Sequence, residues 1–288
     1  MSWQTLPLEL KDRVIDCLYD DPEALKHCAL TCHALLRRSR LNRFHTVTLT
    51  ERNVVPFLQL LRFSPIGDFV HNLIVMTRST NMPSFGPYNS MIWIESRLPE
   101  LAVWIPFVRR LEVQRYDTPR ASTFEGFSSV ENLVFKNSLI SNVNQYRDLL
   151  CCFPSLHSAR FQECMIGKSE KIASPEPNIP SLRSFDFILS QLDPPTFVEW
   201  LLTQPLRDTI EKMALSPIQK PAIQPAGSFL KAVGASLREL RISMIFPRGQ
   251  DNIPGEWSRT PRQTSSQTFA LRGQMYPTKI SPSHLWRA

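Results

Sequence analysis

Glycine is scarce in this chain, which has 9 glycines and 24 prolines among 288 residues. Few positions can therefore adopt a positive φ without cost, which disfavours glycine-rich phosphate loops and a β-protein built from tight hairpins. The longest apolar run, residues 101–108, is far shorter than the roughly 18 residues that a membrane-spanning helix needs. The sequence therefore predicts a protein without a membrane span.

Cysteine is also sparse, and the 6 residues are too few for a disulfide scaffold. The sequence has no Asn-x-Ser/Thr glycosylation acceptor, and charged side chains stand where a signal peptide needs an apolar stretch. These features predict an intracellular protein, in the cytoplasm, the nucleus or both. Hydrolase, Walker A, metalloprotease and dinucleotide-binding motifs are missing as well, so we expect neither catalysis nor a cofactor.

Two histidine–cysteine pairs raise the question of a metal. His27-Cys28 and Cys32-His33 place two cysteines four residues apart on a predicted helix, and such a pair can begin a zinc site. A second pair of ligands is not evident from the sequence. We therefore expect buried thiols and no bound metal.

Charge is distributed unevenly along the chain. The net charge is +7, and residues 246–288 hold 6 basic and 2 acidic residues, so this tail carries +4 and the remainder only +3. A basic tail can bind nucleic acid, but its Pro, Ser, Thr and Gln content is typical of a disordered segment. With 42% apolar residues, the chain as a whole is that of a folded protein.

Three short helices are expected in the first 45 residues. The first carries an apolar stripe at helical spacing that includes Leu10 and Leu18. Asp21 and Pro22 fit the N-cap and the first position of the second helix, and the third should span about residues 29–38. A unit this small must rest its apolar face on the rest of the chain or on a partner.

The same segment, residues 3–46, resembles an F-box. The family pattern opens with a Leu-Pro dipeptide, here Leu6-Pro7, and continues with a leucine and isoleucine stripe. Its last helix has a Val-Cys-x-x-Trp segment, in which Thr31 and Leu35 replace Val and Trp here. F-boxes bind the Skp adaptor of cullin-based ubiquitin ligases. The adaptor contacts that the resemblance implies are Leu6, Pro7, Leu10, Ile15, Leu18, Leu25 and Leu30.

A short apolar motif repeats through the following two hundred residues. The pattern apolar-x-x-apolar-x-apolar begins at Phe44, Val70, Val108, Val130, Leu156, Leu182, Ile210 and Leu237. Successive starts lie 26, 38, 22, 26, 26, 28 and 27 residues apart, and six of these spacings fall within the roughly 20–29 residues of leucine-rich repeats. Residues 56–61, 146–150 and 196–202 between the motifs predict short amphipathic helices.

The body, residues 44–245, therefore resembles an irregular leucine-rich-repeat solenoid, or horseshoe, of about eight units. An F-box followed by divergent leucine-rich repeats is a familiar family arrangement, and the fold class would be α/β. The repeat's usual asparagine is mostly missing, so we expect the loops after the strands to differ from the regular kind. A layered α/β sheet remains the alternative for the body, because it also alternates strands and helices.

The residues between the apolar anchors should point away from the core and line the concave face of a solenoid. They mix both charge signs, which suits a protein ligand better than nucleic acid, whose binders have a one-signed stripe with stacking aromatics. The expected substrate-binding residues are Glu112, Gln114, Arg160, Gln162, Asp186, Lys212 and Arg241.

The resemblance implies a non-catalytic subunit of an SCF-type ubiquitin ligase. The F-box would bind a Skp-type adaptor, and through it a cullin, while the repeats would hold an unidentified substrate protein for ubiquitination. Two alternatives remain at this point. One is a leucine-rich-repeat scaffold whose N-terminal helices are only a cap, and the other is a hydrolase or transferase on a layered sheet.

The C-terminal tail yields the first testable prediction. A solenoid needs a polar cap on its last repeat, and none is evident after Ile242. We expect the solenoid to end early, as in a truncated or aberrant gene product, and residues 246–288 to be a disordered basic tail. Limited proteolysis should then cleave residues 250–288 before the body, whereas equal resistance of both parts would contradict this expectation.

Overall fold

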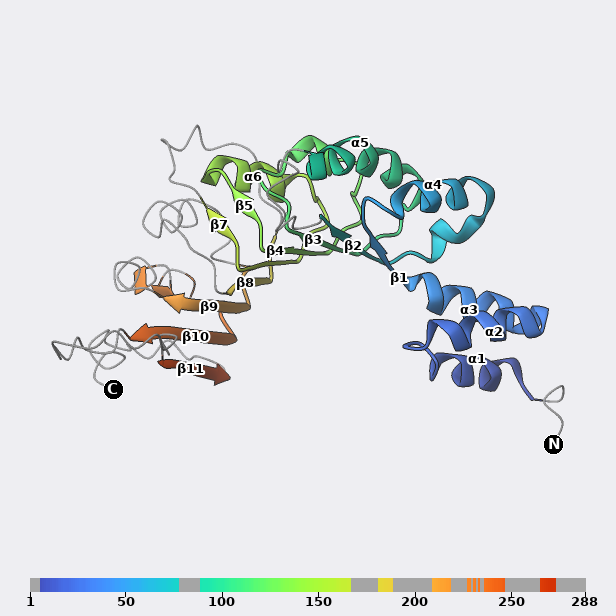
Figure 1. The fold of residues 1–288 in the computed structure, drawn as a ribbon. Helices are drawn as coiled ribbons and strands as arrows, with labels where there is room; N and C mark the ends of the chain where they lie inside the picture. Colours follow the sequence, from blue (N-terminus) through green and yellow to red (C-terminus); the bar gives the residue numbers. More distant parts are fainter. Residues whose placement is uncertain are drawn as a thin grey trace, which may run out of the picture. The chain divides into compact units, whose positions relative to one another are not determined.

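The structure is a computed structural model of the 288-residue chain. It describes residues 6–77, 89–166, 181–188, 209–218, 227–228, 230–231, 233, 236–246 and 265–272. The described residues contain three N-terminal helices and then parallel strands with helices in several of the connections, which confirms the predicted α/β class (Figure 1). The chain divides into two compact units. Unit 1 comprises Met1–Ser138 and Asp148–Leu156, and unit 2 comprises Leu139–Arg147 and His157–Ala288.

Unit 1 begins with three helices, α1 (Leu8–Asp16), α2 (Pro22–Thr31) and α3 (His33–His45). As predicted, Asp21 caps α2, because its Oδ1 accepts a hydrogen bond of 2.9 Å from the amide of Ala24. The predicted bounds of the third helix, residues 29–38, are wrong. The backbone of Cys32 is extended, with φ −158° and ψ 155°, and this ends α2 and lets α3 begin one residue later.

Each of these helices contributes one residue to a small shared core, made by Ile15, Leu25 and Leu35. Leu18 and Cys28 are partly buried and pack against it. Burying one such aliphatic side chain contributes about 1.5–3 kcal/mol. Three of them make a modest core, so polar contacts between the helices matter for the stability of this segment.

The strongest of those polar contacts joins the end of α1 to α3. Arg38 donates to the Asp16 carboxylate through Nε at 2.6 Å and Nη2 at 2.5 Å, and Asn42 donates through Nδ2 at 2.9 Å. The hydrogen bonds from Arg38 lower the pKa of Asp16 despite the opposing effect of burial. Asp16 is therefore charged at neutral pH, and the two-pronged contact fixes α1 against α3.

The remainder of unit 1 is built on parallel strands, β1 (Thr46–Leu49), β2 (Asn72–Met76), β3 (Arg110–Gln114) and β4 (Asn132–Lys136). They pair in chain order. The connections contain α4 (Val54–Phe63), η2 (Pro65–Phe69), α5 (Asn89–Trp104) and η3 (Ala121–Thr123). Parallel neighbours need such crossovers, and α4 and α5 lie on the same side of these strands in Figure 1.

Unit 2 contains four further strands of this kind, β6 (Ser158–Gln162), β8 (Ser184–Ile188), β9 (Lys212–Ile218) and β10 (Glu239–Phe246), again parallel and in chain order. A short parallel pair forms from β5 (Leu139–Ile140) and β7 (Met165–Ile166). The helix α6 (Val143–Cys151) precedes β6, and its residues from Asp148 onward belong to unit 1. The last strand, β11 (Ser265–Arg272), is antiparallel to β10.

All eight repeated motifs of the sequence coincide with these parallel strands. The anchors at the second and third apolar positions are buried in β2, β3, β4, β6 and β8. The residues between the anchors occupy matching positions on neighbouring strands. In unit 1 this row consists of Thr48, Ile74, Glu112 and Val134. In unit 2 it consists of Arg160, Asp186, Ala214 and Arg241.

Other sequence predictions have mixed outcomes. The predicted helices at residues 56–61 and 146–150 lie within α4 and α6, whereas the one at residues 196–202 falls outside the described residues. Most of the predicted tail also lies outside them. Within the tail, which was expected to be disordered, β11 is a strand that the apolar motif does not mark.

The residue after three of the strands adopts the same left-handed backbone conformation. The three residues are Arg115, Asn137 and Glu163, with φ of 57°, 51° and 55°. In each case the next residue is buried, namely Tyr116, Ser138 and Cys164. In unit 1 the amide of Tyr116 donates to Ser138 Oγ at 3.3 Å. The first residue after each of these strands thus has the same left-handed φ, although the repeat's usual asparagine is mostly missing.

Close approach of two segments in unit 1 yields a prediction about stability. Gly67 in η2 is buried, and a Cβ atom there would collide with the backbone carbonyl of Trp104, which cannot move aside as a side chain can. Gly67→Ala should lower the free energy of unfolding by about 1–3 kcal/mol, because overpacking must displace backbone. Urea denaturation measures this difference.

Gly227→Ala provides the matched control, because a Cβ at Gly227 meets nothing within 4 Å. This substitution should change the free energy of unfolding by no more than about 1 kcal/mol. Equal effects of the two substitutions would show that the contact between η2 and the end of α5 is not tight.

Candidate functional site

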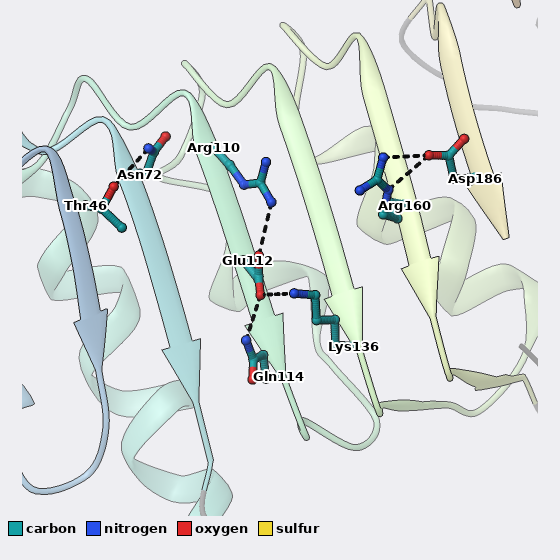
Figure 2. A network of polar contacts seen from close by, with 8 residues as sticks. All are labelled: Thr46, Asn72, Arg110, Glu112, Gln114, Lys136, Arg160 and Asp186. Atoms are coloured by element: carbon teal, nitrogen blue, oxygen red, sulfur yellow. Dashed lines mark hydrogen bonds and ion pairs between the residues drawn. The ribbon is translucent and has the colours of Figure 1, made fainter. Parts of the chain in front are cut away.

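A cluster of polar side chains surrounds one buried carboxylate on the strands of unit 1. Glu112 on β3 accepts from Gln114 Nε2 at 2.6 Å, and its other oxygen accepts from Arg110 Nη2 at 3.2 Å. Lys136 Nζ on β4 lies 2.5 Å from the first oxygen (Figure 2). Alternate residues of a strand share a face, which brings Arg110, Glu112 and Gln114 together. Lys136 pairs opposite Gln114 in the adjacent strand.

The charge of Glu112 depends on these partners. Burial of its side chain raises the pKa, but the hydrogen bonds from Lys136, Gln114 and Arg110 together outweigh burial, and the net pKa is lowered. A buried charge is tolerated only when it is paired in this way. Glu112 is therefore a carboxylate at neutral pH, and it positions the two cations around it.

Unit 2 has the same kind of arrangement on its own strands. Arg160 on β6 donates to Asp186 Oδ2 on β8 through Nε at 3.0 Å, and its Nη2 lies 2.9 Å from the same oxygen (Figure 2). On β10, Arg241 donates to Glu239 Oε1 through Nε at 3.0 Å and Nη2 at 2.6 Å. Both carboxylates thus hold a neighbouring guanidinium in place.

The structure brings some of the predicted substrate-binding residues into contact. Glu112 touches Gln114, and Arg160 touches Asp186. Of the others, Gln162 is half-buried, and Lys212 and Arg241 are exposed. Sequence reasoning missed Arg110 and Lys136. Arg110 stands two residues before Glu112 on a predicted strand, and this alternation was the signal that could have found it.

The residues predicted to contact the adaptor divide into two groups. Ile15 and Leu25 are buried in the core of the three helices, where a partner cannot reach them in this conformation. Leu6 and Leu18 are half-buried, and Pro7 is exposed. Leu10 and Leu30 are the accessible leucines of the set, with 44% and 78% of their surface exposed.

Large apolar side chains are exposed around Leu10 and Leu30 in the sequence. The five from the first three helices and their connections, which we call the helical apolar set, are Leu8, Leu10, Val14, Tyr19 and Leu30. Soluble proteins commonly leave single apolar residues exposed, whereas exposed apolar residues that gather in one patch mark interaction surfaces. These five lie within the 23 residues from Leu8 to Leu30. The chain itself thus leaves the apolar stripe of α1 largely exposed.

The histidine–cysteine pairs form no metal site in the part of the chain that the structure describes. No three side chains of His, Cys, Asp or Glu come together there as possible ligands. The expectation of buried thiols is wrong for Cys32, which is exposed because it lies in the break between α2 and α3, while Cys28 is half-buried. Within the same residues, no helix has the length and apolar character needed to cross a membrane.

Comparisons with known proteins add no relative. The chain matches no protein-family model, and a search of curated proteins finds no match.

The cluster around Glu112 yields a prediction about acid stability. Glu112→Gln should lower the free energy of unfolding at neutral pH by about 1–3 kcal/mol, because Arg110 and Lys136 lose their charged partner. The lowered pKa of Glu112 fixes the sign of the pH dependence. Its stabilising contribution is complete above the ordinary value of 4.5 and is lost as the pH falls through the lowered folded-state pKa.

Urea denaturation between neutral pH and pH about 3 measures this effect. The difference between the parent chain and Glu112→Gln should shrink toward the acid end. Glu51→Gln removes an exposed carboxylate and should change stability by less than about 0.5 kcal/mol at every pH. A difference for Glu112→Gln that is independent of pH would show that the ionised form is not what the cluster stabilises.

Proposed function

We propose that the chain is a substrate-recognition adaptor of an SCF-type (Skp–cullin–F-box) ubiquitin ligase. Residues 3–46 would act as the F-box and bind a Skp-type adaptor, and the repeated body would bind a target protein for ubiquitination. The observation that carries this proposal is the helical apolar set. The three helices expose Leu10 and Leu30 to solvent while burying only a minimal core of their own.

The F-box pattern of the sequence supports the same assignment. In that pattern, the Leu-Pro dipeptide is followed by the first helix, and α1 begins directly after Pro7. A partner that covers Leu8, Leu10 and Leu30 would complete the apolar packing that the three helices begin. The adaptor surface would then consist of the exposed leucines, with Ile15 and Leu25 supporting it from beneath.

For residues 44–245 we propose an irregular leucine-rich-repeat solenoid. Eight parallel strands at intervals typical of such repeats support it, as do the shared left-handed residues after β3, β4 and β6. Ser138 and Cys164 stand three residues after the last anchor of their motifs, where the repeat pattern has asparagine or cysteine. The polar faces of the strands are the proposed substrate surface.

Such a subunit would accelerate ubiquitin transfer without catalytic residues. Binding the adaptor at one end and the substrate at the other makes the encounter of substrate and conjugating enzyme effectively intramolecular. The chain's own residues would supply only affinity and orientation. No cofactor or metal is part of this proposal.

A second candidate function is a leucine-rich-repeat scaffold without a ligase role. It is favoured by the direct continuity of α3 with β1, since α3 ends at His45 and β1 begins at Thr46. The amide of His71 donates to His45 carbonyl oxygen at 3.1 Å, which ties the helix end to the strands. In that case, the three helices would only cap the first repeat.

Adaptor binding distinguishes the two functions. The purified chain should bind a Skp-type adaptor in a calorimetric titration, and a Leu10→Asp, Leu30→Asp double variant should lose at least about 30-fold in affinity. An interface hot spot is worth about 2 kcal/mol or more, and each aspartate would bring an unpaired charge into an apolar contact. Both leucines are exposed, so the double variant should fold.

The matched control carries two aspartates on exposed apolar positions elsewhere in unit 1. Phe63→Asp on α4 and Val103→Asp on α5 replace side chains that are largely exposed. This control should bind the adaptor within about twofold of the parent. A folded parent chain that does not bind the adaptor would overturn the ligase proposal and favour the scaffold.

A further inference from the structure

The ion pairs on the strands of unit 2 leave their bases much more exposed than their acids. In the pair of Arg160 with Asp186, 46% of the arginine side chain is exposed and only 14% of the aspartate. In the pair of Arg241 with Glu239, the figures are 57% and 18%. The formal charges of each pair cancel, but the surface offered to a ligand is mainly guanidinium.

The register of the strands places these groups on one face. Arg160, Asp186, Ala214 and Arg241 pair in succession across β6, β8, β9 and β10. Exposed Lys212 lies two residues before Ala214 on β9 and pairs opposite Glu239. Alternate residues of a strand point to the same side, so Lys212 joins the two arginines on this face. We call Arg160, Lys212 and Arg241 the basic row.

The arginines of the basic row keep hydrogen-bonding capacity beyond their ion pairs. A guanidinium has five N–H donors, and both arginines hold their carboxylates through Nε and Nη2. Nη1 takes no part in these bonds. Because the carboxylates already hold the planar groups in position, a second anion can bind without first ordering a flexible side chain.

We propose that the basic row binds an extended, acidic peptide segment of a partner protein through its carboxylate or phosphate groups. The identification of that partner as a ligase substrate rests on the proposed function above. The binding surface itself does not depend on that function. The proposal also refines the expected mixed-charge surface, because Asp186 serves to position Arg160 and is not itself presented to the ligand.

The dimensions of the row suit an extended chain. Arg160 and Arg241 are three strand spacings apart, and at about 4.8 Å per spacing their backbones are about 14 Å from each other. An extended peptide advances about 3.3 Å per residue, so four residues cover that distance. Residues four apart in an extended chain point the same way, and acidic side chains at such positions could reach both arginines.

Single-stranded nucleic acid fits this face less well. Its binding surfaces combine cations with aromatic side chains on which the bases stack. Between the two arginines of the basic row, the neighbouring strands present Asp186 and Ala214. Neither side chain is aromatic, so the positions between the two arginines offer bases nothing to stack on.

Peptide binding by the full chain tests the proposal. Fluorescein-labelled octaglutamate should bind in a fluorescence anisotropy titration, more tightly at low salt than at about 0.15 M salt, and octalysine should not bind. An Arg160→Gln, Arg241→Gln double variant should weaken the octaglutamate affinity about tenfold or more, because charge-assisted hydrogen bonds are the strong ones. A phosphoserine-containing octapeptide, used as competitor, distinguishes a phosphorylated ligand from a carboxylate-rich one.

Arg183→Gln combined with Arg238→Gln is the matched control. Both arginines are exposed, and each immediately precedes a strand of unit 2, so the control removes the same charge outside the basic row. The control should change the affinity by less than about threefold. Thermal unfolding of both double variants checks that they fold.

Equal weakening by the two double variants would overturn the proposal, because it would show a response to net charge alone. Tighter binding of octathymidine than of either acidic peptide would also overturn it, in favour of nucleic acid. Because this assay contains no adaptor, its result is independent of the ligase proposal. Loss of peptide binding with intact adaptor binding would refute only the basic row, and the reverse result would refute only the ligase role.

Discussion

In-register pairing of parallel strands is the constraint on which the rest of the structure depends. A parallel neighbour can be reached only by a crossover. Each repeat must therefore bring the chain back beside the start of the previous strand before the next strand begins. Once neighbouring strands start in register, the side-chain period of two places the apolar anchors on one face of the strands and the residues between them on the other. The contacts of Glu112 with Lys136 and of Arg160 with Asp186 exist because neighbouring strands keep this register.

The repeated body could be predicted from the sequence because its signal is redundant. Each motif alone is a short apolar pattern, but eight of them at similar spacing mark the eight parallel strands from β1 to β10 other than β5 and β7, including the pairing positions of Thr48, Ile74 and Glu112. The polar cluster could be predicted only in part. The contacts of Glu112 with particular charged neighbours depend on side-chain conformation and burial. The apolar pattern of the sequence contains information on neither. The strand β11 has no apolar motif at all, so nothing in the sequence distinguished it from the rest of the tail.

The three helices show that helical periodicity alone does not predict which residues reach the core. The stripe that contains Leu10, Val14 and Leu18 has the correct spacing, yet the residue of α1 that reaches the core is Ile15. A stripe identifies an apolar face but does not say whether that face meets the chain itself or solvent. The choice is made by how α1 packs against α3, and the Asp16 contact with Arg38 and Asn42 helps to fix that packing. The leucines left outside this core are the basis of the proposed adaptor surface.

The left-handed residues after β3, β4 and β6 bear on how such a chain can change over evolutionary time. The backbone turns at the point where each of these strands ends, at Arg115, Asn137 and Glu163. Each turn therefore fixes which residues of its strand face the core. Adding or removing one residue inside a strand would exchange its buried and polar faces. Length can vary without that penalty only in the segments between a turn and the next anchor, and the spacing between motifs does vary there, from 22 to 38 residues. The polar face can therefore diverge residue by residue while the strands beneath it remain unchanged.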